Sequence, residues 1–390
     1  MSRLKIIIFV GLFLGFYALV NTFIYVRLLH LLSLRNSLFF VVSAVLLFMI
    51  CAYPLGRISE RIGRGFLSDE ITWIGSFWLG AMTYLFLIFA FLEIVKLILT
   101  QWLNLGPFYQ SIPVTFFRLL GAAILLIVAI LLGYGYRIAK YPRMTTVHVP
   151  LKKLKSSCNP LKIIQLSDIH LGTMINQKRL EEIVQAVNAR RPDLVVITGD
   201  LIDENVAKAA SLMGPLSKMK SRCGIYAVTG NHEFYAGAHR AVQFMKQAGI
   251  RVLRNETVTI ENILNIIGVD DLEAGRFEGK PAGDYHDLMR AANPALPTVL
   301  LNHRPQQLKA AAQAGIALQL SGHTHHGQLF PFNYVTDLVY DISSGFGRVG
   351  EMFVYVSNGV GTWGPPVRIG APPEIAEIIL EAVEKKERDL

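Results

Sequence analysis

Cysteine is scarce in this chain, which has three in 390 residues, Cys51, Cys158 and Cys223. An odd and widely spaced set does not build the disulfide framework of a small secreted domain. Cysteine usage is that expected of a protein in a reducing compartment. Internal repeats and low-complexity tracts are also missing, which excludes a repeat architecture.

Acidic residues are rare in the first part of the chain, where residues 1–143 hold 12 Lys and Arg against 4 Asp and Glu. The remainder holds 26 basic residues against 25 acidic ones, so it is nearly neutral although the net charge is +9. Binding to nucleic acid requires a concentration of positive charge along a groove that follows the phosphates. Here the excess belongs to the flanks of apolar segments, which excludes a nucleic-acid partner and favours a membrane.

Long apolar stretches fill the chain before Pro142. There are four of them, Ile6–Val26, Ser37–Tyr53, Ile71–Leu92 and Val114–Tyr136, and an apolar helix of this length crosses about 30 Å of hydrocarbon. The first is too long for a signal-peptide core and three more follow it, so it is not a cleaved leader. The sequence predicts a transmembrane region of four helices over residues 1–141, with Glu93 and Lys96 paired or reaching the interface at the end of the third span.

Beyond residue 160, short strand-like runs alternate with helix-like segments. The strand-like runs are rich in Ile, Val and Leu, as in strands buried on both faces: Leu161–Leu166, Leu194–Ile197, Ile225–Val228, Ile263–Val269, Thr298–Leu301, Ile316–Leu320, Met352–Ser357 and Ile375–Leu380. The helix-like segments are Gln177–Ala189, Val206–Met219, Ala238–Ala248 and Pro305–Ala314. We expect an α/β domain over residues 161–390, joined to the spans by a basic linker over residues 142–160.

Five polar clusters of metal-ligand type lie in order along this domain, four of them directly behind a strand-like run. They are Asp168-x-His170, Gly199-Asp200, Gly230-Asn231-His232-Glu233, His303, and Gly322-His323-Thr324-His325. Residues beyond the carboxyl ends of strands share one crevice, so these ligands can converge on two divalent cations. One Asp-x-His alone is usually a turn beside a surface histidine, whereas five clusters in order indicate a metal site that hydrolyses a phosphate ester.

The clusters resemble those of the calcineurin-like metallophosphoesterase superfamily, over roughly Leu161–Ala382. The finer resemblance is to a membrane-associated bacterial branch, on Asp168–Gly172, Gly199–Asp203, the segment containing Gln328, and Pro366–Ile375. His326 departs from that branch, whose members usually have Gly at this position. The resemblance implies an α/β fold, a four-layer αββα sandwich of two packed sheets with helices outside, preceded here by the four-helix transmembrane region.

Ligand roles follow from the resemblance. It implies one metal held by Asp168, His170, Asp200 and His325, and a second held by Asp200, Asn231, His303 and His323. Asp200 would be shared, and a hydroxide between the two ions would attack phosphorus. Such mixed ligands accept Mn, Fe or Zn. His232 would be the general acid that protonates the leaving group.

Other polar residues have weaker assignments. Glu233 is expected to orient His232 or a metal-bound water, or to be a solvated loop residue, and Asp203 to cap the following helix. Asp270 and Asp271 could reach the substrate, although acidic pairs of this kind are more often turn residues. Arg368 is a candidate phosphate clamp by analogy with other phosphoesterases.

The expected function is metal-dependent hydrolysis of a phosphodiester or pyrophosphate bond. Anchoring to the bilayer favours a lipid-linked substrate, such as a phospholipid headgroup or a UDP-acylated sugar. Two alternatives stay open at this stage. One is a phosphodiesterase of soluble substrates such as cyclic nucleotides, and the other is a non-catalytic metal-binding module that regulates a membrane sensor or transporter.

Basic residues also predict how the chain crosses a bacterial inner membrane. One side collects eleven of them, Arg3, Lys5, Arg57, Arg61, Arg64, Arg137, Lys140, Arg143, Lys152, Lys153 and Lys155. The other side has only Arg27 and Arg35, in the first loop. Because the basic side faces the cytoplasm, both termini and the catalytic domain are expected there.

A reporter fusion after Leu390 tests this orientation. A reporter that is active only outside the cytoplasm should be silent at this position, and a cytoplasmic reporter should be active. The opposite pattern would reverse the topology and remove cytoplasmic nucleotide-linked lipids from the possible substrates.

Overall fold

The computed structural model describes residues 3–62, 65–155 and 160–383. Cys158 and Arg64 lie outside these ranges. The chain divides into two compact units, one of residues 1–137 with 364–367, the other of residues 138–363 with 368–390.

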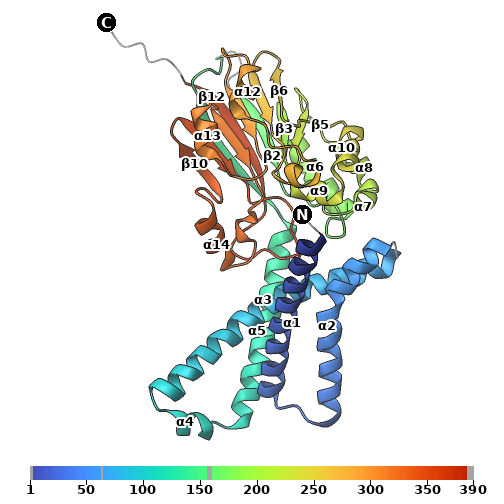
Figure 1. The fold of residues 1–390 in the computed structure, drawn as a ribbon, viewed down its shortest axis with the longest axis vertical. Helices are drawn as coiled ribbons and strands as arrows, with labels where there is room; N and C mark the ends of the chain where they lie inside the picture. The colour runs from blue at the N-terminus through green and yellow to red at the C-terminus, as the bar shows by residue number, and fades with distance from the viewer. Residues whose placement is uncertain (1–2, 63–64, 156–159, 384–390) are drawn as a thin grey trace. The chain divides into compact units, whose positions relative to one another are not determined.

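The first unit is helical (Figure 1). Among its described residues, four helices are long and apolar enough to cross a membrane, as predicted: α1 (Arg3–Leu32), α2 (Asn36–Ile62), α3 (Gly65–Leu97) and α5 (Val114–Lys140). Between α3 and α5 lie a π-helical turn, η1 (Ile98–Trp102), and the short α4 (Gly106–Ser111). These helices extend past the predicted spans. The spans were predicted from apolar residues alone, whereas the helices continue through polar residues at their ends.

Small residues let α2 and α3 approach each other closely. A Cβ on Gly75 of α3 would overlap the backbone of Tyr53 in α2, which is the contact that small residues permit between apolar helices. The charged pair near the end of α3 is more elaborate than expected, because Glu93 lies 3.0 Å from Arg27 and 4.0 Å from Lys96. Arg27, expected in the first loop, lies inside α1.

Two six-stranded sheets form the centre of the second unit. The order in the first is β1-β12-β2-β3-β4-β5 and in the second β10-β11-β9-β8-β7-β6. The first sheet contains β1 (Arg143–Leu151), β2 (Leu161–Leu166), β3 (Leu194–Thr198), β4 (Ile225–Val228), β5 (Arg251–Val252) and β12 (Glu374–Ala382). The second contains β6 (Glu256–Ile260), β7 (Leu264–Gly268), β8 (Thr298–Leu301), β9 (Leu318–Ser321), β10 (Gly345–Val349) and β11 (Met352–Val356).

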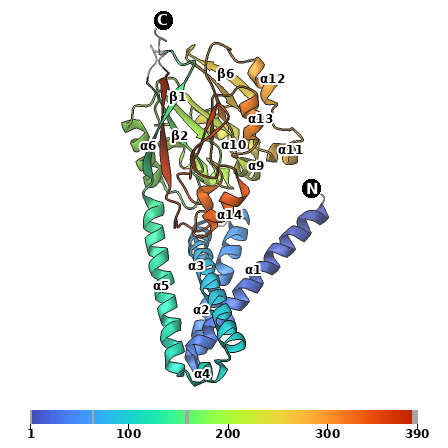
Figure 2. The same cartoon turned by 90° about the vertical axis from the view of Figure 1, so that its left-hand side faces the viewer.

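The sheets pack face to face and helices cover their outer faces (Figure 2). One apolar core joins the two sheets through residues such as Ile163, Ile378 and Ile266. A second core lies between the first sheet and the helices α6 (Gln177–Ala189) and α10 (Ala238–Gln247). A third joins the second sheet to α12 (Tyr285–Arg290) and α13 (Leu308–Gln313). The αββα prediction is therefore confirmed.

The linker predicted over residues 142–160 is wrong along Arg143–Leu151, which form β1. This strand pairs in parallel with β12, Arg143 opposite Glu374 and Leu151 opposite Ala382. It lies at the edge of the sheet, so many of its side chains are exposed and its sequence lacks the apolar run of a central strand.

Several helices differ from the predictions. The segment Val206–Met219 is broken into α7 (Val206–Ala210) and α8 (Met213–Leu216). The predicted helix over Pro305–Ala314 begins only at Leu308, because Gln307 has a left-handed backbone. Four short helices among the described residues of this unit were not anticipated, α9 (Asn231–Ala236), α11 (Glu273–Phe277), α12 (Tyr285–Arg290) and α14 (Phe332–Val339), and neither were the strands β5, β6 and β10.

Candidate metal centre

The five polar clusters meet at one edge of the two sheets. Asp168, Asp200 and Asn231 follow β2, β3 and β4, while His303 and His323 follow β8 and β9. Backbone hydrogen bonds join neighbouring loops: Asp168 N–H donates to the Gly199 carbonyl at 3.1 Å, and Gly322 N–H to the His303 carbonyl at 2.9 Å. The His323 N–H, behind a strand of the second sheet, donates to Asp168 Oδ2, behind a strand of the first, at 3.0 Å, so loops from both sheets form one connected site.

Left-handed backbone conformations are concentrated here. Five of the seven predicted ligands have φ between 47° and 72°: Asp168, His170, Asp200, His323 and His325. Non-glycine residues rarely adopt this region, and several together at one place usually mark a functional site. This conformation changes the direction of the backbone at the end of each strand, so that these side chains approach one another.

Two glycines allow the loops to approach each other. A Cβ on Gly230 would overlap the Asp200 carboxylate, and a Cβ on Gly322 would overlap the side chains of Ser167 and Asp168. The clusters that begin with these glycines therefore depend on a residue without a side chain.

The seven predicted ligands form two adjoining groups. In one, His325 Nε2 lies 3.1 Å from His170 Nε2 and 3.4 Å from Asp168 Oδ1. In the other, His303 Nε2 lies 3.2 Å from Asp200 Oδ2, 3.2 Å from Asn231 Oδ1 and 3.1 Å from His323 Nδ1. Asp200 also forms a close group with His170 and His232, so its carboxylate lies where the two groups meet.

The donor atoms suit divalent cations. In each group two imidazole nitrogens face each other at 3.1 Å, so a single cation between them could accept a lone pair from both. Burial lowers the pKa of His170 to about 4, and burial also holds the pKa of His323 and of His325 well below the usual value. Neutral imidazole is the form that binds metal.

Asp200 and His303 are a buried ion pair. Burial opposes ionisation of Asp200, but His303 and His232 outweigh it and hold the pKa of Asp200 well below its usual value. Burial likewise lowers the pKa of His303, yet the Asp200 carboxylate raises it to about 10. The charge on His303 balances that of Asp200, and a cation bound by both residues would take over this role.

Groups behind the ligands fix their orientation. His303 Nδ1 lies 2.8 Å from the Thr198 carbonyl, which directs Nε2 toward Asp200. The Arg368 guanidinium is fully buried and donates to the His325 ring, the His325 carbonyl and the Gly361 carbonyl. The proposed phosphate clamp at Arg368 is therefore wrong, because these donors are used to hold His325.

His232 borders the first group of ligands. Its backbone N–H donates to Asp200 Oδ1 at 2.9 Å, and its Nδ1 lies 3.2 Å from the Asp203 carbonyl and 3.3 Å from the Asp203 carboxylate. Burial lowers the pKa of His232, but Asp200 and Asp203 outweigh burial and raise it to about 9. The helix cap expected of Asp203 is supplied instead by Asn205, which caps α7.

Three other acidic residues have structural partners. Glu233 is buried and accepts hydrogen bonds from the backbone N–H groups of Gly230, Asp200 and Ile202, so it neither orients His232 nor is solvated. Asp270 pairs with Arg254 at 2.8 Å. Asp271 pairs with Arg304 at 2.7 Å. Neither aspartate is a free turn residue, and both carboxylates are committed to arginine.

Aromatic residues around His232 were not anticipated. The ring of Tyr235 lies 5.4 Å from that of His232, and the ring of Trp363 lies 6.3 Å away. Trp363 is held by Gln328, whose side chain donates to the Trp363 carbonyl at 2.8 Å and accepts from its N–H at 2.9 Å. His326, with φ of 46°, lies 3.6 Å from Asp337 of α14. A single aromatic residue such as Tyr235 or Trp363 carries no sequence signal that would place it beside His232.

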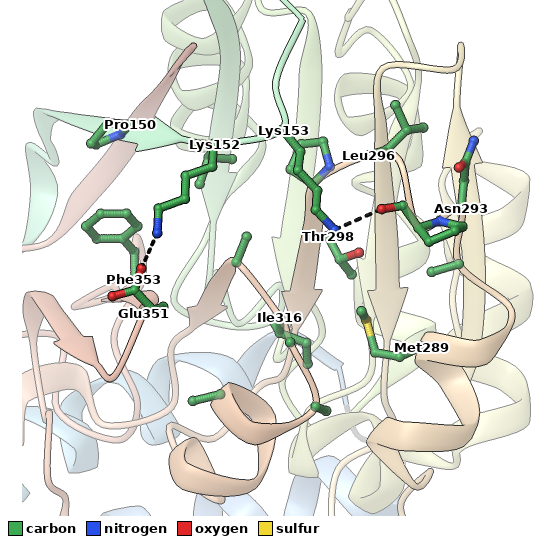
Figure 3. A pocket seen from close by; sticks show the side chains of 18 of the residues that line it. Pro150, Lys152, Lys153, Met289, Asn293, Leu296, Thr298, Ile316, Glu351 and Phe353 are labelled. Atoms are coloured by element: carbon green, nitrogen blue, oxygen red, sulfur yellow. Dashed lines mark hydrogen bonds and ion pairs between the residues drawn. The ribbon is translucent and has the colours of Figure 1, made fainter. Parts of the chain in front are cut away.

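A cavity of about 610 Å³ lies at the opposite ends of the strands (Figure 3). Its walls include Leu151 at the end of β1, Thr298 at the start of β8 and Phe353 in β11. Lys152 pairs with Glu351 and Lys153 donates to the Pro294 carbonyl. Since its walls include none of the predicted ligands, this cavity is separate from the histidine cluster.

Comparison with known proteins agrees with the geometry. The family of calcineurin-like phosphoesterases matches residues 161–327. A transmembrane protein with metallophosphoesterase domain from Bos taurus is 39% identical over 258 residues, 63% of this chain and 58% of that protein. An uncharacterized metallophosphoesterase of Campylobacter jejuni is 32% identical over 387 residues, 97% of this chain and 99% of that protein.

A further relative, an uncharacterized metallophosphoesterase of Aquifex aeolicus, is 34% identical over 257 residues, 65% of this chain and 98% of that protein. The chain thus spans little more than half the length of the bovine relative but almost the whole of these two bacterial ones. The Campylobacter match includes the apolar helices as well as the sheets. The chain belongs to the calcineurin-like metallophosphoesterase family.

Proposed function

We propose that this protein is a membrane-anchored, metal-dependent phosphoesterase. The observation that carries the proposal is the meeting of seven buried or half-buried donors in two groups at Asp200. Asp168, His170, Asp200 and His325 would hold one divalent cation, and Asp200, Asn231, His303 and His323 a second. Two cations there supply positive charge for the phosphoryl oxygens and ease deprotonation of an attacking water.

His232 is the residue we assign to proton donation. Its Nδ1 is held by Asp203, 3.2 Å from the carbonyl and 3.3 Å from the carboxylate, so the ring has a fixed orientation beside the ligands. The Asp203 carboxylate beside Nδ1 raises the pKa of this imidazole and so favours the protonated ring. A protonated imidazole can deliver its proton to the leaving oxygen as the P–O bond breaks.

A lipid-linked phosphodiester or pyrophosphate is the substrate class we favour. Four helices able to cross a bilayer confine the enzyme to a membrane, where lipid substrates are concentrated. The exposed indole of Trp363 and the ring of Tyr235 flank His232 and provide apolar surface for a substrate's non-phosphate part. We place the protein in a bacterial inner membrane with this site in the cytoplasm, as the distribution of basic residues indicates.

Hydrolysis of a chromogenic phosphodiester by the detergent-purified full chain tests the activity. Hydrolysis should require Mn²⁺, disappear after chelation and return when the metal is restored, because the donors alone lack an electrophile. Full metal loading with no hydrolysis of any phosphodiester or pyrophosphate would instead favour a regulatory metal-binding module.

Asp200→Asn should abolish hydrolysis and lower the metal content. The substitution removes the charge that lies between the two ligand groups, so two cations could no longer be held close together. Metal analysis by mass spectrometry checks this, with Asp287→Asn at an exposed ion pair as control. Two ions per chain in Asp200→Asn would contradict the shared role of Asp200.

His232→Ala should leave the metal content nearly unchanged and slow the cleavage of esters with poor leaving groups by about 10²–10⁴-fold. Esters with good leaving groups need little protonation and should lose less. The matched control is His148→Ala, since His148 is exposed and pairs with Glu381 at the sheet edge. An equal loss across a leaving-group series would mean that His232 positions the substrate and does not donate a proton.

A further inference from the structure

The helix α14 presents an unusual apolar surface. Six apolar or aromatic residues in and before this helix are exposed, Leu338 to 88% and the others to between 41% and 65%: Phe330, Phe332, Tyr334, Val335 and Val339. We call these six residues the α14 patch. None of the eight residues of α14 is buried. Single exposed apolar residues are ordinary, but six within ten positions form a contiguous patch that normally marks an interface.

Charge is absent from the α14 patch. The charged side chain of α14, Asp337, accepts from the Ser343 hydroxyl and lies 3.6 Å from His326. Both partners belong to the loops next to the candidate metal centre, so this carboxylate, whose side chain is 48% exposed, is paired on its protein-facing side. A helix that pairs its charge in this way and exposes Leu, Val and Phe suits the lipid–water boundary, where the carboxylate can stay at the level of the headgroups.

The α14 patch is firmly attached to the loop that carries His323 and His325. A Cβ on Gly327 would overlap the backbone of Phe332 and Asn333, so α14 packs directly against this loop. The Thr324 hydroxyl donates to the Ser343 carbonyl at 2.6 Å, and the Tyr340 ring lies 6.4 Å from the His323 ring. A partner that covers the α14 patch is therefore held at a fixed distance from the candidate metal centre.

The polypeptide enters the catalytic unit at the same end. The last apolar helix, α5, ends at Lys140 and β1 begins at Arg143, where Arg143 pairs with Glu374 at the start of β12. Because β12 is antiparallel to β2, its first residues lie beside the carboxyl end of β2, which Asp168 follows. Two residues thus separate a helix able to cross a bilayer from the sheet edge that bears the ligands.

We propose that the α14 patch inserts into the lipid bilayer and holds the metal centre at the lipid–water boundary. The occupant is a bilayer because the chain is anchored in one by its own helices and its short connection reaches this edge. Tyr334, half apolar and half polar, suits the headgroup level, and Leu338 the hydrocarbon. The consequence for catalysis rests on the proposed function: a phosphoester at the headgroup level would meet the ligands without leaving the membrane.

Lipid quenching tests the insertion without any need for activity. In the full chain with Cys51, Cys158 and Cys223 replaced by Ser, a single Leu338→Cys carries an environment-sensitive fluorophore. The control is Val383→Cys, exposed beyond the far end of β12. In phosphatidylcholine–phosphatidylglycerol vesicles containing spin-labelled lipid, the label at position 338 should lose most of its emission and the label at 383 little.

Two results would overturn the insertion. One is equal quenching, or none, at both positions. The other is emission at position 338 that is not quenched by spin-labelled lipid but changes when the protein is diluted with lipid. That result would mean that a second copy of the chain covers the α14 patch.

Substrate choice tests the catalytic consequence. Leu338→Glu should lower hydrolysis of a long-chain phosphodiester embedded in vesicles at least about tenfold relative to a soluble chromogenic phosphodiester, since burial of a leucine side chain is worth more than one decade in binding. Val383→Glu should leave this ratio unchanged. A ratio unaltered by Leu338→Glu would refute the role of α14 at the membrane. If no variant cleaves any phosphoester, the proposed function fails, and lipid quenching still decides the insertion.

Discussion

The Asp200 carboxylate is the group on which the rest of the site depends. One oxygen lies 3.2 Å from His303 Nε2 and the other accepts the His232 N–H at 2.9 Å. Its own backbone N–H is bound by Glu233, which also binds the loop that carries Asn231. A buried anion is tolerable only when donors or cations surround it. The two sheets must therefore bring their loops to this carboxylate from both sides.

Rigid sheets make this convergence possible. The strands before the ligand loops are almost entirely buried, and a shared core joins the two sheets. That core offsets the cost of five non-glycine residues in left-handed conformations at the edge. Gly230 and Gly322 lie where loops from different strands nearly touch, and a side chain at either position would overlap the neighbouring loop.

Polar and apolar surfaces alternate around the metal centre. Buried carboxylates and imidazoles form its floor, while Trp363, Tyr235 and the α14 patch present exposed rings and aliphatic groups beside it. A water-soluble phosphate requires only the floor. The proposed lipid-linked substrate would use both surfaces, because it joins a phosphate to an apolar chain.

Sequence alone determined eight of the twelve strands of the described residues, the four apolar helices and the ligand clusters. Each of these depends on local pattern: apolar runs of strand length, apolar runs of membrane length, and polar residues just behind a strand. Patterns of this kind do not reveal long-range partners. The edge strand Arg143–Leu151 was read as a linker because its pairing with Glu374–Ala382 spans more than two hundred residues. The same reason explains three wrong assignments. Only the folded chain places Arg368 against His325, Glu233 against the backbone N–H groups of two loops, and Asp203 beside His232. The exposure of α14 also required the tertiary structure, because apolar residues at helical spacing look alike whether they face a core or a membrane.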